Sequence, residues 1–136
     1  MANRKVNSRE QLRKTSTRSS QLSAETSWVP NTNVYIAERI ALITVEVAGM
    51  KKEDLQLAAD GNRLRIAGHR EDVGRTVKGT FQQMEIRYGT FESIVELPEG
   101  YDLTQARAAY DNGFLRVEVP ALIRPPKRPV TVPLMD

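Results

Sequence analysis

The residues of this chain that could carry out catalysis are few and poorly arranged. His69 is the only histidine, it stands among Arg70, Glu71 and Asp72, and cysteine is absent. Neither a nucleophile elbow nor a phosphate loop of the G-x-x-x-x-G-K-[ST] type occurs. One histidine with scattered carboxylates does not indicate a metal site. We therefore expect no enzymatic activity, no small-molecule substrate, no cofactor and no metal, and we interpret His69 as a solvated residue at a strand end.

The C-terminal end of the sequence favours binding to another chain through an extended backbone. Val130-Thr131-Val132 follows the proline-rich segment 124–129, and its two valines would share one face of an extended chain. Such a segment can add to a sheet edge. Burying two valines contributes roughly 3–4 kcal/mol, at about 1.5–2 kcal/mol each, which alone corresponds to about millimolar affinity. In the alternative interpretation, the valines pack on their own domain or have no partner.

The length of the chain and the distribution of its charges indicate one domain with two tails. The chain has 136 residues and a net charge of +3, and it contains no apolar run long enough for a signal peptide or a membrane span. We expect a cytoplasmic protein. Residues 1–27 hold six Lys or Arg and two Glu and have no aromatic side chain. Such a segment buries too little apolar surface to fold alone, so we expect a disordered basic arm.

Short alternating runs with turn signals dominate residues 28–120. Asn112-Gly113 predicts a tight hairpin, because both residues of this turn type must adopt positive φ. Some eight strands at this spacing predict an all-β, immunoglobulin-like antiparallel β-sandwich. Residues 103–109 could form a helix by propensity, but the hairpin that follows favours a strand. The expected strands are 34–36, 41–47, 54–59, 63–67, 82–88, 90–97, 106–110 and 114–119, with residues 69–80 as a long loop.

The order of these motifs resembles one protein family. The segments that carry the resemblance are WVP at 28–30, VYIAE at 34–38, VEVAGMKKEDL at 45–55, NRLRIAGHR at 62–70, EIRYGTF at 85–91, LPEG at 97–100 and AAYDNGFLRVEVP at 108–120. Together they are similar to the α-crystallin domain of small heat-shock proteins. The resemblance implies an ATP-independent holdase chaperone that binds unfolding proteins and works as a dimer-based oligomer. It places the sandwich at 28–120, the arm at 1–27 and a C-terminal extension at 121–136.

The resemblance also implies two interfaces between subunits. Val130 and Val132 would dock into a groove between two edge strands of a neighbouring subunit, and the side chains that would line the groove are those of Leu55, Leu57, Ala106 and Ala108. The segment after the long loop would pass into a partner's sheet to form a dimer. Its residues are Met84, Glu85, Ile86, Arg87 and Tyr88. The alternative for this segment is an ordinary solvated loop followed by a strand within the chain.

Four departures from the family pattern leave alternatives open. Ala48 replaces a usual proline, Ser93 replaces a usual arginine on the apolar face, the C-terminal motif has valines in place of isoleucines, and the arm lacks aromatic residues. One alternative function is therefore a scaffold-like interaction sandwich with little client-holding activity. Another is a nucleic-acid-associated module that uses the basic arm. The folded part argues against nucleic acid, because it has no basic and aromatic surface for stacking bases. For Trp28, packing at the core edge is favoured over contact with clients.

Overall fold

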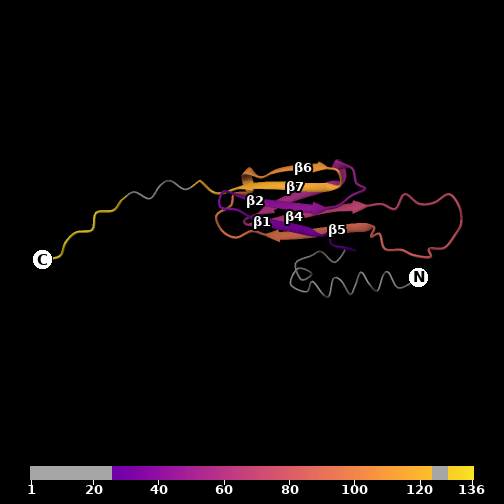
Figure 1. Ribbon diagram of the computed structural model, residues 1–136, viewed down its shortest axis with the longest axis horizontal. Coiled ribbons are helices and arrows are strands. Elements are labelled where there is room, and N and C mark those ends of the chain that lie inside the picture. Colours follow the sequence, from indigo (N-terminus) through magenta and orange to yellow (C-terminus); the bar gives the residue numbers. More distant parts are fainter. Residues whose placement is uncertain (1–25, 124–128) are drawn as a thin grey trace.

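The protein folds as two antiparallel sheets packed face to face, with a loop projecting from one end and the C-terminal segment extending from the other (Figure 1). The computed structural model describes residues 26–123 and 129–136. Two 3-10 turns, η1 (Lys52–Asp54) and η2 (Leu103–Gln105), accompany strands β1 (Thr32–Ile36), β2 (Ile40–Glu46), β3 (Leu55–Asp60), β4 (Arg63–Arg70), β5 (Gly89–Glu96), β6 (Arg107–Asp111) and β7 (Phe114–Pro120). The expected all-β sandwich is confirmed.

One sheet has the order β1-β2-β7-β6 and the other has the order β3-β4-β5. Neighbouring strands in both sheets are antiparallel. The β6–β7 hairpin closes through Asn112 and Gly113, which have φ of 51° and 82°. Both residues therefore adopt the positive φ that the sequence predicted for this turn.

Alternation along the strands produces the core. On β2 and β7, the residues that face the other sheet are apolar and buried, while their neighbours face solvent. Phe91 on β5 is completely buried and packs against Trp28 with 4.9 Å between ring centroids. The main members of the core are Trp28, Ala41, Ile43, Val45, Val47, Leu64, Ile66, Phe91, Val95, Leu97, Leu103, Leu115, Val117 and Val119.

Two local expectations need correction. Residues 82–88 form no strand within the chain, because neither sheet offers them a ladder in this structure. Alternation in a sequence predicts which face a residue would occupy, but a strand exists only where a partner supplies the hydrogen bonds. The run 103–109 begins as the 3-10 turn η2, in which the Asp102 carboxylate accepts a hydrogen bond from the Thr104 amide, and it becomes strand β6 only at Arg107.

The arm and the proline-rich segment fall mostly outside the described residues. The expected disorder of residues 1–27 therefore concerns positions of which only Thr26 and Ser27 are described, and the proline-rich segment is described only at Pro129. Among the described residues, no helix is long and apolar enough to cross a membrane.

Candidate functional site

The two sheets are held together along one side of the sandwich by β1 and β5. The Thr32 and Ser93 hydroxyl oxygens lie 3.2 Å apart across this side, and Trp28 makes a parallel bridge to Phe91 on β5. Because β1 and β5 are edge strands of their sheets, the opposite edge strands, β3 and β6, must share the other side. The two strands that were predicted to flank a docking groove therefore lie at the same side of the fold.

The direction of β3 and β6 across this gap follows from contacts at one end. The Tyr110 hydroxyl donates a 2.7 Å hydrogen bond to the Val47 carbonyl, and Gly113 packs against Ala48. The Arg70 guanidinium, at the end of β4, also donates to the Ala48 carbonyl. The start of β3 pairs with the end of β4, so β3 starts where β6 ends. The two strands run in opposite directions across the gap.

The core-facing side chains of these two edges leave apolar surface partly exposed, and we call this region the β3/β6 groove. Leu55 and Ala106 are partly buried against the core, Ala108 is exposed, and Leu57 retains 39% exposure despite facing the same side as the buried Ile66. The structure thus brings Leu55, Leu57, Ala106 and Ala108 to facing edges. Their role in docking stays a prediction, because no second chain is present.

A second apolar edge lies on β1. Val34 and Ile36 face the same side as the buried Ile43 and Ala41 of β2, yet they are 43% and 45% exposed. The outer edge of β1 has no ladder partner among the described residues. Sequence reasoning did not single out this edge. The available signal was the continuous apolar run Val34-Tyr35-Ile36, where alternation would have marked a half-buried strand.

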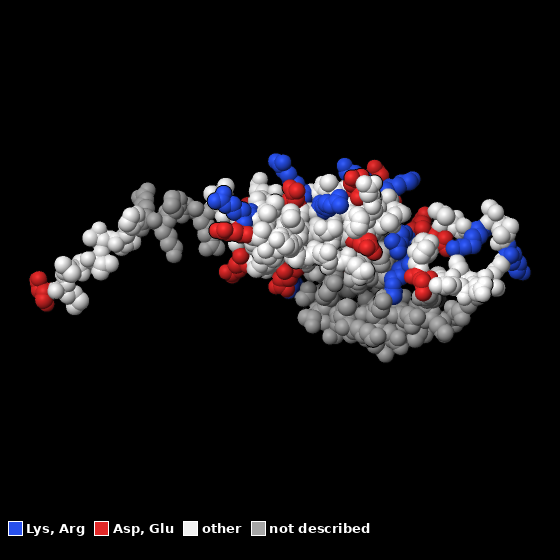
Figure 2. Space-filling model, in the orientation of Figure 1, with Lys and Arg blue, Asp and Glu red and all other residues white. Residues whose placement is uncertain are grey.

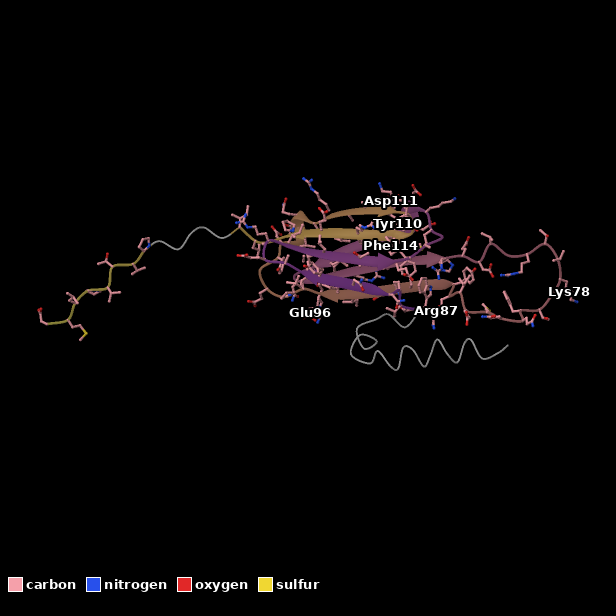
Figure 3. The ribbon with its side chains drawn as sticks, in the orientation of Figure 1. Lys78, Arg87, Glu96, Tyr110, Asp111 and Phe114 are labelled. Atoms are coloured by element: carbon pink, nitrogen blue, oxygen red, sulfur yellow. The ribbon has the colours of Figure 1, made fainter. Side chains whose placement is uncertain are left out.

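The segment predicted to exchange between subunits lies at the base of a projecting loop (Figure 3). Lys78 stands near the tip of this loop and Arg87 at its base. Ile86 is exposed, whereas Met84 and Tyr88 are partly covered. Glu85 and Arg87 have their own interactions within the molecule. All five residues therefore lie together between the loop and β5, beside the sandwich and outside both sheets.

Arg70 fastens the two ends of this loop. Its Nε and one terminal nitrogen both donate to the Arg87 carbonyl, at 2.8 and 2.5 Å. The guanidinium also stacks on the Trp28 ring, with 4.2 Å from its central carbon to the centroid, and lies 5.8 Å from the Tyr88 centroid. Partial burial lowers the pKa of Arg70, but an arginine remains charged at neutral pH. The sequence placed Arg70 beside His69 and within the motif at 62–70, but it did not predict this role.

Trp28 and Ser93 occupy interior positions. Trp28 is buried and donates from its indole nitrogen to the Gly89 carbonyl at 3.0 Å, so its expected packing role is confirmed and it offers little surface to a client. Ser93 is completely buried beside Phe91 and Val95, as alternation predicted. Its hydroxyl pairs with that of Thr32, which shows what a small polar side chain contributes at this position.

His69 and the distribution of charged side chains are the remaining features that the sequence singled out. The His69 ring nitrogen Nδ1 lies 3.2 Å from the Thr90 hydroxyl in an exposed setting at the end of β4. No cluster of three or more potential metal ligands occurs among the described residues. Basic and acidic side chains are mixed over the face seen in Figure 2, where no basic patch stands out.

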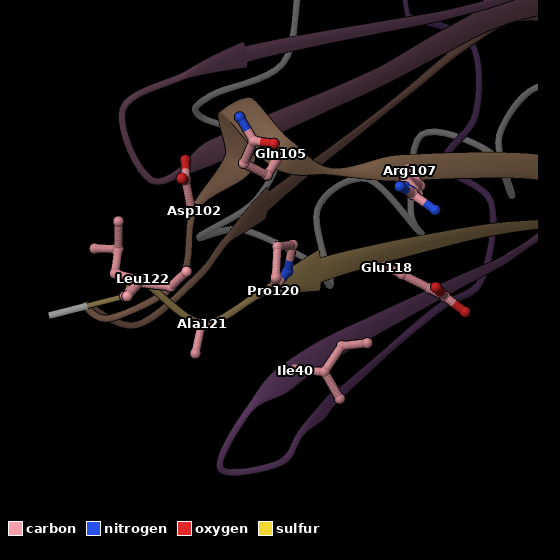
Figure 4. Close-up of a pocket in the computed structure, with 9 residues that line it drawn as sticks. Ile40, Asp102, Gln105, Arg107, Glu118, Pro120, Ala121 and Leu122 are labelled. Atoms are coloured by element: carbon pink, nitrogen blue, oxygen red, sulfur yellow. The ribbon is translucent and has the colours of Figure 1, made fainter.

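The C-terminal motif does not pack on its own domain. Val130 and Val132 are 84% and 80% exposed, and the segment 129–136 extends away from the sandwich (Figure 1). A pocket of about 660 Å³ lies near the origin of this extension, between η2, the end of β7 and Leu122 (Figure 4). Its lining mixes apolar residues such as Ile40 with the charged Arg107 and Glu118.

Comparison with known proteins identifies the family. The sequence model of the Hsp20/alpha crystallin family matches residues 37–134. The chain belongs to this family. Members are small heat shock proteins, which are typically chaperones, form oligomers and generally have no enzymatic activity.

Individual relatives agree with this assignment. Heat shock protein 16 of Schizosaccharomyces pombe is 30% identical over 93 residues, which are 67% of this chain and 65% of the relative. The 17.8 kDa class I heat shock protein of Arabidopsis thaliana is 33% identical over 104 residues, 74% of this chain and 66% of the relative. This small heat shock protein thus spans slightly less than two thirds of these relatives.

The solved structures show the same sandwich. Heat shock protein 16.0 from Schizosaccharomyces pombe superposes with a TM-score of 0.63 at 26% identity, covering 77% of this chain and 98% of that one. HSP18.5 from E. histolytica gives a TM-score of 0.62 at 25% identity, covering 77% of this chain and 99% of the other. The resemblance inferred from the sequence motifs is confirmed.

Proposed function

We propose that this protein is an ATP-independent holdase, which binds unfolding proteins and keeps them from aggregating, and that it works as a dimer-based oligomer in the cytoplasm. The observation that carries the proposal is the pair of unfinished apolar edges, β1 on one side and the β3/β6 groove on the other. A monomeric soluble protein normally covers such edges, because exposed apolar strands recruit other chains. Among the described residues, no strand covers the outer edge of β1 or the β3/β6 groove, and in this proposal subunits and unfolded segments occupy them.

Dimerisation by strand exchange is supported by a match between donor and acceptor. The donor segment carries Ile86 on an extended stretch without a ladder, and the acceptor edge β1 carries exposed Val34 and Ile36. Adding the segment from one chain to β1 of a second would cover the apolar side chains of both and add backbone hydrogen bonds along the outer edge of β1. Arg70 would fix the base of the loop from which the segment projects.

Higher assembly is supported by the C-terminal extension. Val130 and Val132 are exposed and extended, and the β3/β6 groove presents the partly exposed Leu57. In this proposal, residues 28–120 form the dimerising sandwich, residues 121–136 link dimers, and residues 1–27 contribute to client capture. One docked valine pair supplies only about millimolar affinity, so assembly depends on several contacts acting together.

Aggregation suppression tests the holdase directly. Light scattering of a heat-labile client is followed without ATP, with increasing amounts of this protein. We expect suppression near equimolar ratios. If several-fold excess fails while the protein remains folded by circular dichroism, the holdase proposal is wrong and an interaction scaffold is the better assignment.

Two variants test the assembly. The double variant V130A/V132A should reduce the oligomer to dimers by light scattering, whereas the matched control T131A should leave its mass unchanged. Deleting residues 71–83 should give folded monomers, because the donor segment can no longer reach a partner. Unchanged mass in the double variant contradicts tail docking, and persistent dimers in the deletion variant contradict strand exchange.

A further inference from the structure

The C-terminal extension carries a third apolar residue in phase with the two valines. Val130, Val132 and Leu134 follow one another at intervals of two residues, and Leu134 is 97% exposed. In an extended chain, residues at this interval point to the same face. The extension therefore presents three apolar side chains in a row.

The prolines of the extension fix which of its edges can pair. Pro129 and Pro133 flank the motif at odd positions, so both lie on the edge opposite to the N–H groups of Val130, Val132 and Leu134. Proline has no N–H and is tolerated in a strand only where that position faces away from the ladder. Only Thr131 could donate from the edge that carries the prolines. The extension can therefore pair through one edge and would end a sheet there.

The groove has a matching repeat. Leu55, Leu57 and Ala59 of β3 face the same side, since Leu57 and Ala59 pair with the core residues Ile66 and Leu64 of β4. Tyr110 and Ala108 of β6 face this side too, opposite Leu115 and Val117 of β7. Since β3 starts where β6 ends, counting from that end would match the side chains in three rungs, which are Leu55 with Tyr110, Leu57 with Ala108, and Ala59 with Ala106, the residue just before β6.

The rungs differ in free space. The first holds two large side chains, which pack against the core, whereas the third holds only two methyl groups. Successive rungs are two residues apart, or about 6.6–6.8 Å. Three side chains of an extended peptide repeat at the same distance. The largest of them fits best where the groove is emptiest.

We propose that the extension of a second copy of this chain docks with three anchors and in one direction, with Val130 at the Leu55/Tyr110 rung, Val132 at the middle rung and Leu134 at the Ala59/Ala106 rung. The docked strand then runs parallel to β3 and antiparallel to β6. It pairs through the N–H groups of its even-numbered residues, while its proline edge faces solvent. This inference rests on the proposed docking of the tail, to which it adds an anchor, a direction and a register.

A double-mutant cycle in the full-length protein tests the third anchor and the direction. The measured quantity is the concentration at which half of the oligomer dissociates, followed by mass photometry on dilution. L134A should raise it about tenfold, as expected for half the transfer free energy of a leucine side chain. A59L fills the third rung from an exposed position, so it should have a similar effect. In the A59L background, L134A should add nothing, whereas V130A should keep its full effect.

Each outcome of the cycle has a definite meaning. If A59L abolishes the effect of V130A and leaves that of L134A intact, the direction is reversed and the proposal is overturned. If L134A has no effect while V132A weakens assembly, the third anchor is wrong but tail docking stands. If V132A also has no effect, tail docking itself fails.

A second pair of variants tests the register without touching the folded domain. T131P removes an N–H from the edge that already carries two prolines and should leave assembly within about twofold of the parent protein. V132P removes an N–H from the pairing edge and should weaken assembly at least tenfold more than V132A does. Equal effects of T131P and V132P would overturn the proposed pairing edge.

Discussion

Replacing Gly68 by alanine should test how closely β3 and β5 are packed around β4. Gly68 lies opposite Leu55 on one side and Phe91 on the other. A Cβ atom at this position would lie 2.6 Å from the Phe91 Cζ atom and 2.7 Å from the Asp54 carbonyl oxygen. Neither neighbour can move easily, because Phe91 is completely buried and the other atom belongs to the backbone at the start of β3.

The expected magnitude follows from two opposing effects. Overpacking a core costs about 1–3 kcal/mol, and three contacts below 3.0 Å, two of them to the Phe91 ring, put this site near the upper limit. The lower entropy of the unfolded alanine chain offsets about 0.4–1 kcal/mol of this cost. The net loss in the free energy of unfolding is about 2 kcal/mol. For a domain of this size, it lowers Tm by about 8–16 °C.

Thermal unfolding followed by circular dichroism measures this loss. The matched control is G79A, because a Cβ at Gly79 meets nothing within 4 Å and its φ is not positive. We expect the control to melt like the parent protein. Relief of the clash would push Asp54 and the start of β3 outward, so G68A should also weaken oligomer assembly. A Tm for G68A within 2 °C of the parent, a shift of at most about 0.5 kcal/mol, would refute the close packing described here.

Three further substitutions probe the loop and the groove. R70M should speed hydrogen exchange of the amides at the base of the loop. It removes two hydrogen bonds to the Arg87 carbonyl and a cation–π contact with Trp28 worth about 1 kcal/mol. Unchanged exchange would argue against the fastening role of Arg70. Y110F should cost about 1 kcal/mol in denaturant unfolding, because the Val47 carbonyl loses its 2.7 Å partner; an unchanged midpoint would contradict this. The hydrogen bond from Arg75 is the main cause that lowers the pKa of Asp72, and the hydrogen bond from the Gly74 amide is the second. The Asp72–Arg75 pair therefore stabilises the folded state fully above the ordinary carboxyl pKa. This stabilisation is lost as pH falls through the lowered pKa. R75Q should raise the pKa of Asp72 in an NMR titration, and an unshifted curve would exclude the pair.

The sequence predicted well those features that depend on local pattern. Positive φ at Asn112 and Gly113, the buried alternation on β2 and β7, and the interior position of Ser93 all follow from residue type and period. Each requires only that one face of a strand be apolar or that a turn accept a particular backbone conformation.

The features that the sequence did not predict depend on which segments meet. Residues 82–88 alternate like a strand but lack a ladder within the chain, and alternation carries no information on partners. Arg70 acts through the carbonyls of residues 48 and 87, which no spacing in the sequence connects. The apolar edge of β1 becomes visible only in the structure, where Val34 and Ile36 remain exposed although they face the same side as buried residues of β2.

Several exposed apolar side chains lie on strand edges, and others lie on segments that could cover those edges. Val34 and Ile36 stand on an edge, and Ile86 lies on a segment without a ladder; Leu57 stands in a groove, and Val132 lies on an extended tail. Each pair is too small to hold two chains alone, since burying one valine contributes about 1.5–2 kcal/mol. An assembly built from many such contacts gains its strength by multivalency, yet any single contact can open. In the proposed assembly, opening one contact would free an apolar edge of the kind that an unfolding chain could occupy, so the weakness of each contact would link assembly to the proposed capture of clients.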